Sequence, residues 1–110
     1  MQPASTWNDT IVALATPPGI GAIAVIRLSG TQALEVVQKL FPARQLASQP
    51  SHSILVGMLR EGDLPLDEVV LSIFRNPRSY TGEDVAEISC HGSPFIQQQI
   101  LEACVRQGAR

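Results

Sequence analysis

The chain has 110 residues, of which 45% are hydrophobic and 16% charged, and its formal net charge is -2 at pH 7. Its length and apolar content predict a single domain, residues 1–110, with its own hydrophobic core. The 8 Lys and Arg residues against 10 Asp and Glu residues provide no basic surface for a phosphate backbone, and no apolar run is long enough to span a membrane. The composition therefore predicts that this chain is neither the main nucleic-acid-binding surface of a protein nor a membrane anchor.

The start of the chain predicts two neighbouring strands. Residues 10–16 form a short apolar run, and residues 22–29 read AIAVIRLS, which is rich in β-branched residues and too short for a lone helix. The loop between them, TPPGIGA, favours an antiparallel connection. This loop is glycine-rich, but it lacks the Lys-Ser or Lys-Thr of a P-loop and is followed by a strand instead of a helix. A hairpin connection is therefore the favoured reading.

A helix is expected directly after the second strand. Ser29 and Gln32 have the spacing of a capping box, and Pro42 closes the segment. The stretch that follows reads as a surface loop. Three apolar residues recur at helical spacing between these limits: Leu34, Val37 and Phe41.

Three further strands and a second helix follow. Residues 53–60 and 67–75 predict a strand pair joined by the turn EGDLP, and residues 85–90 predict the last strand. Ser93 and Pro94 are favoured at the first positions of a helix. One face of that helix is expected to carry Ile96, Ile100, Ala103 and Cys104, and the other Gln97, Glu102 and Arg106. The order of elements predicts an α+β fold, a mixed, largely antiparallel sheet with two helices packed on it.

Two charged residues stand out because they lie inside apolar strands. Alternation places Arg27 on one face with Ile23 and Val25, and Glu87 on one face with His91. A charged side chain in such a place must reach solvent, pair with an opposite charge or hold a ligand. Arg27 and Glu87 are therefore candidate binding residues, with structural pairing as the alternative.

Other reactive side chains offer weaker signals. Cys90 and Cys104 are expected to be buried thiols rather than a disulfide, and their spacing from the two histidines predicts no metal site. His91 has the chemistry of a general base, although a histidine that opens a helix is more often structural. Tyr80 is placed to cover a pocket with its ring, although such a residue is more often simply on the surface. No catalytic residue is predicted in this chain.

Two long motifs resemble one known family. The string DTIVALATPPGIGAIAVIRLSG, residues 9–30, resembles the opening of the tRNA-modification GTPases called MnmE or TrmE. The string RSYTGEDVAEISCHG, residues 78–92, resembles the second hallmark of the same amino-terminal domain. Between them, His52, Gly57 and the string DEVVLSIF fall where that family has similar residues. The resemblance runs from residue 9 to residue 110.

The resemblance implies a fold similar to the folate-binding domain of the glycine-cleavage T-protein. It implies binding of 5-formyl-tetrahydrofolate or a related folate, with contacts from Arg27 and Glu87, and formation of a homodimer. Stacking by Tyr80 is a further expectation. The parent proteins add a helical domain and a G domain that uses GTP, Mg²⁺ and K⁺. With the flavoprotein MnmG, also called GidA, they modify the wobble uridine of tRNA, which implies a cytoplasmic protein.

The chain departs from the family pattern at a few places. Ser93 stands where the family usually has a second glycine after His91-Gly92, and Ile20 stands where relatives often carry a charge. The family segment that supplies further folate contacts follows the position of Arg110. The alternative interpretation is therefore a structural dimerisation domain without a working folate pocket in this fragment. An independent one-carbon transfer enzyme is a weaker interpretation, because only His91 suggests itself as a catalytic group.

Overall fold

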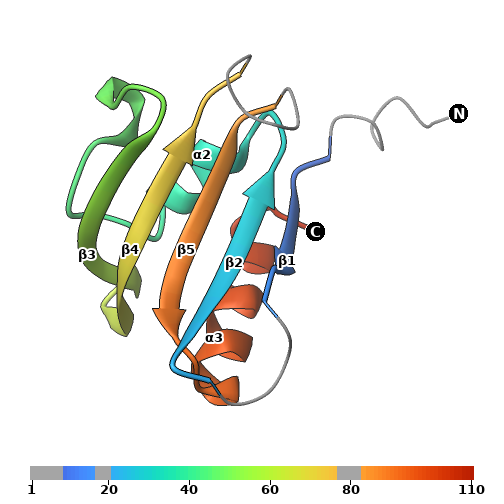
Figure 1. Cartoon of the computed structure of the whole chain (residues 1–110), viewed down its shortest axis with the longest axis vertical. Helices are drawn as coiled ribbons and strands as arrows, with labels where there is room; N and C mark the ends of the chain where they lie inside the picture. Colours follow the sequence, from blue (N-terminus) through green and yellow to red (C-terminus); the bar gives the residue numbers. More distant parts are fainter. Residues whose placement is uncertain (1–8, 17–20, 77–82) are drawn as a thin grey trace, which may run out of the picture.

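A five-stranded antiparallel sheet carries helices on one of its faces (Figure 1). The structure is a computed structural model that describes residues 9–16, 21–76 and 83–110. The spatial order of the strands is β1-β2-β5-β4-β3, and all neighbours run antiparallel. This arrangement confirms the predicted α+β fold. The elements are β1 (Ile11–Leu14), β2 (Ile23–Ser29), α2 (Ala33–Gln38), the 3₁₀ helix η1 (Leu46–Ser48), β3 (Ser53–Glu61), β4 (Leu64–Phe74), β5 (Val85–His91) and α3 (Pro94–Arg106).

The two central strands alternate between buried and accessible side chains as the sequence predicts. On β2, Ile26 and Leu28 are fully buried, whereas Arg27 between them is partly accessible. On β5, Ala86 and Ile88 are fully buried. Because successive side chains of a strand point to opposite faces, the buried set faces α2 and α3 and forms the core. The other face of the sheet carries both polar and apolar side chains.

The cap of α2 differs from the predicted capping box. The Ser29 hydroxyl donates to a carboxylate oxygen of Glu83 at 3.0 Å and does not cap the helix. Instead, the backbone N–H of Gln32 donates to the hydroxyl oxygen of Thr10 at 3.1 Å. The prediction of a Ser29–Gln32 capping box was wrong, because the hydroxyl of Thr10, the residue before β1, accepts from the same backbone group.

The segment after α2 is more buried than a surface loop. Phe41 lies beyond the end of the helix and is fully buried, and Leu46 in η1 is buried as well. A Cβ added at Gly57 of β3 would lie 2.9 Å from the Phe41 ring, so the absence of a side chain there makes room for the ring. The Gln38 side-chain amide donates to the Phe41 carbonyl at 3.0 Å and accepts from the Leu46 N–H at 2.6 Å. One glutamine thus fixes the path of the connection.

The β3–β4 hairpin has a tighter turn than predicted. The first strand continues to Glu61 and the second begins at Leu64, so of the five residues predicted in the turn, Glu61 belongs to β3 and Leu64 and Pro65 belong to β4. Gly62 has φ +60°, a conformation that glycine adopts readily and that permits the short turn. The register shifts after Leu59, where Arg60 pairs with Pro65, and this irregularity accommodates a proline that has no N–H to donate.

The last helix begins as predicted and buries one unexpected residue. The hydroxyl oxygen of Ser93 accepts from the Ile96 N–H at 3.5 Å, and proline occupies the first turn. Gln97 was expected on the polar face but is buried. The buried stripe runs through positions 97, 100 and 104, so helical spacing from Ile100 and Cys104 carries Gln97 inward. Within the described ranges, no helix is long and apolar enough to cross a membrane.

The end of the described chain adds to the edge of the sheet. The Arg110 N–H donates to the Thr10 carbonyl at 2.9 Å, and the Val12 N–H donates to the Arg110 carbonyl at 3.0 Å. The Arg110 guanidinium also pairs with the Asp9 carboxylate. Residues 9–12 and residue 110 therefore lie side by side, next to α3 (Figure 1).

Candidate functional site

The face of the sheet opposite the helices is the surface that carries the candidate site. We call the outward side chains of the five strands on this side the open face, because no described helix packs on it (Figure 1). Apolar patches left accessible on a protein surface mark sites that bind other molecules. The open face exposes several large apolar side chains: Ile11, Ile23, Ile54, Val56 and Val70.

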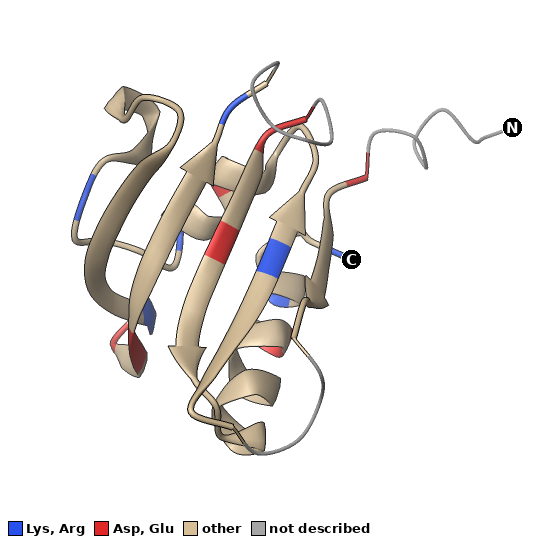
Figure 2. Ribbon diagram, viewed as in Figure 1, with Lys and Arg blue, Asp and Glu red and all other residues tan. Residues whose placement is uncertain are grey.

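An ion pair occupies the centre of the open face. Arg27 and Glu87 are direct cross-strand partners in the β2–β5 register. Arg27 Nε donates to Glu87 Oε2 at 2.8 Å, and Arg27 Nη2 lies 2.8 Å from the same oxygen. Figure 2 shows a basic position on β2 beside an acidic one on β5. The same-face prediction for each residue is confirmed, and the structure adds that the two side chains meet.

The pair remains accessible to a ligand. The Arg27 side chain is 41% exposed and the Glu87 side chain 19% exposed. Cross-strand pairs at such exposure contribute about 0.2–1 kcal/mol to stability. A carboxylate beside a guanidinium presents strong acceptors and donors side by side. That combination suits a flat, polar heterocycle with both kinds of group along one edge.

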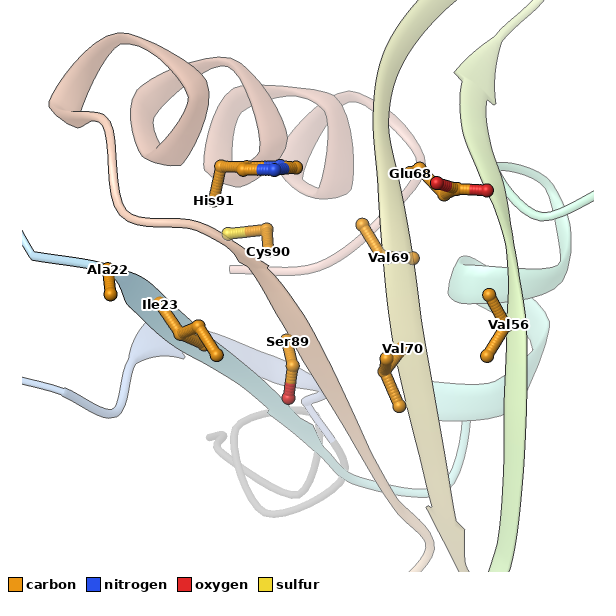
Figure 3. A pocket seen from close by; sticks show the side chains of 9 residues that line it. All are labelled: Ala22, Ile23, Val56, Glu68, Val69, Val70, Ser89, Cys90 and His91. Carbon is orange, nitrogen blue, oxygen red and sulfur yellow. The ribbon is translucent and has the colours of Figure 1, made fainter.

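A hollow with a volume of about 280 Å³ lies near the end of β5, and its lining includes Ser89, two residues along the strand from Glu87, but neither member of the ion pair. It is reached along β5 from Glu87 through Ser89, which lies on the same face. Ligand sites usually measure about 300–1,000 Å³, so this hollow admits a ring system but not a much larger molecule on its own. Figure 3 shows its lining side chains: Ala22, Ile23, Val56, Glu68, Val69, Val70, Ser89, Cys90 and His91.

A histidine–aspartate contact lies at the end of the hollow and was missed by the sequence reasoning. The ring Nδ1 of His91 is 2.8 Å from Asp67 Oδ1, and the backbone N–H of His91 donates to Asp67 Oδ2 at 2.8 Å. The sequence identified His91 as a possible base but gave no reason to choose Asp67 as its partner. The two residues lie 24 positions apart and come together only through the pairing of β4 with β5.

The two cysteines are buried free thiols, as predicted. Burial is the main reason that the pKa of Cys90 rises to about 11 and that of Cys104 to about 12. The negative charges of Asp67 and Glu61 raise the pKa of the nearer thiol further in each case. Neither thiol is therefore an activated nucleophile at neutral pH.

Two further predictions concern residues of the loop before β5 and metal binding. Tyr80 lies in residues 77–82, outside the described residues, so its stacking role stays a prediction. In the described ranges, no three His, Cys, Asp or Glu side chains gather as they would around a metal ion.

A family model and the sequences of individual relatives both place the chain in the same family. The family described as "GTP-binding protein TrmE N-terminus" matches residues 10–110. Over 94% of the chain, the sequence is 55% identical to a "tRNA modification GTPase MnmE" of Christiangramia forsetii and 53% identical to one of Cytophaga hutchinsonii. It is 44% identical to one of Enterococcus faecalis over 100% of the chain. These matches cover 22%, 22% and 24% of the three relatives, so the chain spans less than a quarter of their length.

Proposed function

The chain belongs to the family of TrmE amino-terminal domains, and from that premise we propose that it is a folate-binding and dimerisation module of a tRNA-modification GTPase. The relatives are enzymes by name, and the chain corresponds only to their amino-terminal part. The module itself is not catalytic. Its role is to hold 5-formyl-tetrahydrofolate, or a related folate, for chemistry completed by the rest of the protein.

The observation that carries the folate proposal is the Arg27–Glu87 pair, with a hollow of about 280 Å³ further along β5. A pterin carries neighbouring N–H donors along its amino-pyrimidinone edge. A carboxylate such as Glu87 accepts from two such donors, and a charged hydrogen bond contributes about 1.5–3 kcal/mol. Arg27 supplies donors for the acceptors of the same ring. The residues present therefore fit a folate, which would supply the one-carbon unit when bound.

The two polar contacts do not provide enough binding free energy by themselves, so we propose that a second surface covers the bound ligand. Micromolar binding needs about 8 kcal/mol, more than two polar contacts provide. Apolar contact with Ile23, Val56 and Val70 contributes part of the remainder, and Tyr80 is proposed to contribute by stacking. A second copy of the chain on the open face would cover these side chains and enclose the ligand. Homodimerisation and folate binding are thus linked proposals.

The remaining activities belong to the longer protein that this family forms. We propose that its G domain binds GTP with Mg²⁺ and K⁺, and that it acts on the wobble uridine of tRNA together with the flavoprotein MnmG, also called GidA. A cytoplasmic location follows from that task. The net charge of -2 is consistent with a module that leaves most of the tRNA contact to other parts.

Calorimetric titration with 5-formyl-tetrahydrofolate tests the folate proposal. The wild-type chain is compared with Arg27→Ala and Glu87→Gln, and with Arg44→Ala and Glu102→Gln as charge-matched controls outside the open face. We expect saturable binding that is lost in the first two variants and kept in the controls. Binding that survives both site substitutions would refute the site. Failure of the wild-type chain to bind would refute folate binding and favour the structural dimerisation domain.

The exposed apolar residues of the open face independently favour dimerisation. Ile54 and Val56 are among the most exposed large apolar side chains of the described chain and lie on one strand. Sedimentation equilibrium of the wild type and of Val56→Lys separates the possibilities. We expect a dimer that the substitution dissociates. A wild-type monomer at high micromolar concentration would count against dimerisation through this chain, whether or not folate binds.

A further inference from the structure

One aspartate holds one histidine by two separate groups. The Asp67 carboxylate accepts from the backbone N–H of His91 at 2.8 Å and contacts the ring Nδ1 at 2.8 and 3.0 Å. The Asp67 side chain is only 9% exposed, whereas the His91 side chain is 69% exposed. The carboxylate is thus fixed in the protein, and the ring that it orients faces outward.

The contact selects the form of the imidazole. An ionised carboxylate only accepts hydrogen bonds, so the ring nitrogen next to Asp67 carries the hydrogen. In the neutral ring, Nε2 then holds the lone pair and serves as the acceptor. A carboxylate that orients a histidine in this way is the usual support of histidines that exchange protons with, or hydrogen-bond to, a ligand.

His91 lies on the same strand as Glu87 of the ion pair. His91 and Glu87 share the open face of β5 with Ser89 between them, and both Ser89 and His91 line the hollow. Four residues of a strand span about 13 Å, which exceeds the length of one polar contact and leaves room for a ring system between the two side chains. In the proposed folate site, a pterin whose amino edge meets Glu87 would direct its other end along β5 toward His91.

We propose that Asp67 orients His91 so that its Nε2 accepts a hydrogen bond from an N–H of the folate near the one-carbon end. The inference rests on the proposed folate function and adds a contact residue, His91, and a positioning residue, Asp67. The Cys90 thiol, with a pKa of about 11, stays protonated at neutral pH and does not compete for this task. Glu68 is the other charged side chain in the described lining of the hollow.

Nitrogen-15 NMR of the histidine rings gives a readout that does not depend on enzyme activity. In the 110-residue chain, neutral His91 should show a protonated Nδ1 and an unprotonated Nε2. Addition of 5-formyl-tetrahydrofolate should shift the His91 Nε2 resonance, whereas the ring of His52, the only other histidine, should not respond. Asp67→Asn should redistribute the His91 tautomers, and its melting temperature reports whether the variant is folded.

Affinity measurements complete the test. His91→Asn places an amide N–H near the position of Nδ1, so it keeps a donor for Asp67 but removes Nε2. We expect folate affinity to fall roughly tenfold, the loss of one hydrogen bond, and His52→Asn to bind like the wild type. Saturable wild-type binding with an unchanged His91 resonance and unchanged His91→Asn affinity would overturn the inference and leave the folate function standing. Absence of wild-type binding would overturn both.

Discussion

Gly21 and Gly92 pack backbone against backbone where β2 begins and β5 ends. The Gly21 N–H donates to the Gly92 carbonyl at 3.2 Å, and the Gly92 N–H donates to the Ala22 carbonyl at 3.3 Å. A Cβ added at Gly92 would lie only 1.9 Å from the Gly21 carbonyl oxygen. This approach holds the end of β5 against β2 beside His91, at the edge of the hollow.

Gly92→Ala is therefore expected to destabilise the chain strongly. The methyl group would meet backbone, which cannot move aside as a flexible side chain can, and overpacking of this kind costs about 1–3 kcal/mol. Gly62→Ala is the control, because a Cβ there meets nothing within 4 Å and the substitution costs only the strain of a positive φ, about 1 kcal/mol. Urea unfolding measures both. Equal losses at the two positions would contradict the clash.

Thr10 is expected to stabilise α2 although it lies 22 residues before Gln32, the N-cap of the helix. Thr10→Val keeps the shape of the side chain but removes the acceptor of the Gln32 N–H, and loss of such a cap costs about 1 kcal/mol. Thr31→Val, at an exposed position, should change the free energy of unfolding by much less. If the two valine variants unfold at the same urea concentration, the cap does not stabilise the helix.

The Arg27–Glu87 pair should contribute little to stability. A double-mutant cycle with Arg27→Ala, Glu87→Ala and the double variant is expected to give a coupling of about 0.2–1 kcal/mol, because both side chains are partly exposed. Chemical unfolding of the four proteins provides the numbers. A coupling well above 2 kcal/mol would indicate that the pair exists for the fold and would weaken its assignment to a ligand.

The buried thiols predict how stability depends on pH. Because the pKa values of Cys90 and Cys104 in the folded chain are raised from 9.0 to about 11 and about 12, their contribution is complete below pH 9. It is lost as the pH rises toward these values, since the unfolded thiols ionise first. The free energy of unfolding should fall above about pH 9, and less so in a variant with both cysteines replaced by alanine.

Labelling with iodoacetamide gives a second measure of the same property. At pH 8 the folded chain should react slowly and the chain in urea quickly, because the thiolate is the reactive form. Rapid labelling of the folded protein at this pH would show that at least one thiol is accessible and ionised.

The sequence predicted the faces of the strands better than the contacts between them. Alternation in residues 22–29 and 85–90 depends only on local geometry, and for this reason the outward positions of Arg27 and Glu87 were correct. Contacts across long separations have no such local signal. Ser29 bonds to Glu83 and Thr10 caps α2, and neither partner was identifiable without the order of the strands.

At the candidate site, too, the individual residues were predictable from the sequence but their contacts were not. Each charged residue was singled out because it interrupts an apolar strand, but their direct contact depends on β5 lying beside β2. The partnership of Asp67 with His91 requires the pairing of β4 with β5. Gln97 was misplaced for a different reason, because the polar side chain was assigned to the outer face of α3 by its chemistry, whereas the helical stripe carries it inside.

The position of β5 has a consequence for how the chain is made. This strand is the last of the five in sequence, yet it lies between β2 and β4 and joins the β1–β2 hairpin to the β3–β4 hairpin. An isolated hairpin is marginally stable in water, and non-local pairings slow folding. During synthesis the two hairpins therefore cannot join into one sheet until residues 85–91 have been made. The cross-strand partners Arg27 and Glu87, which lie 60 positions apart, then meet only at this late step.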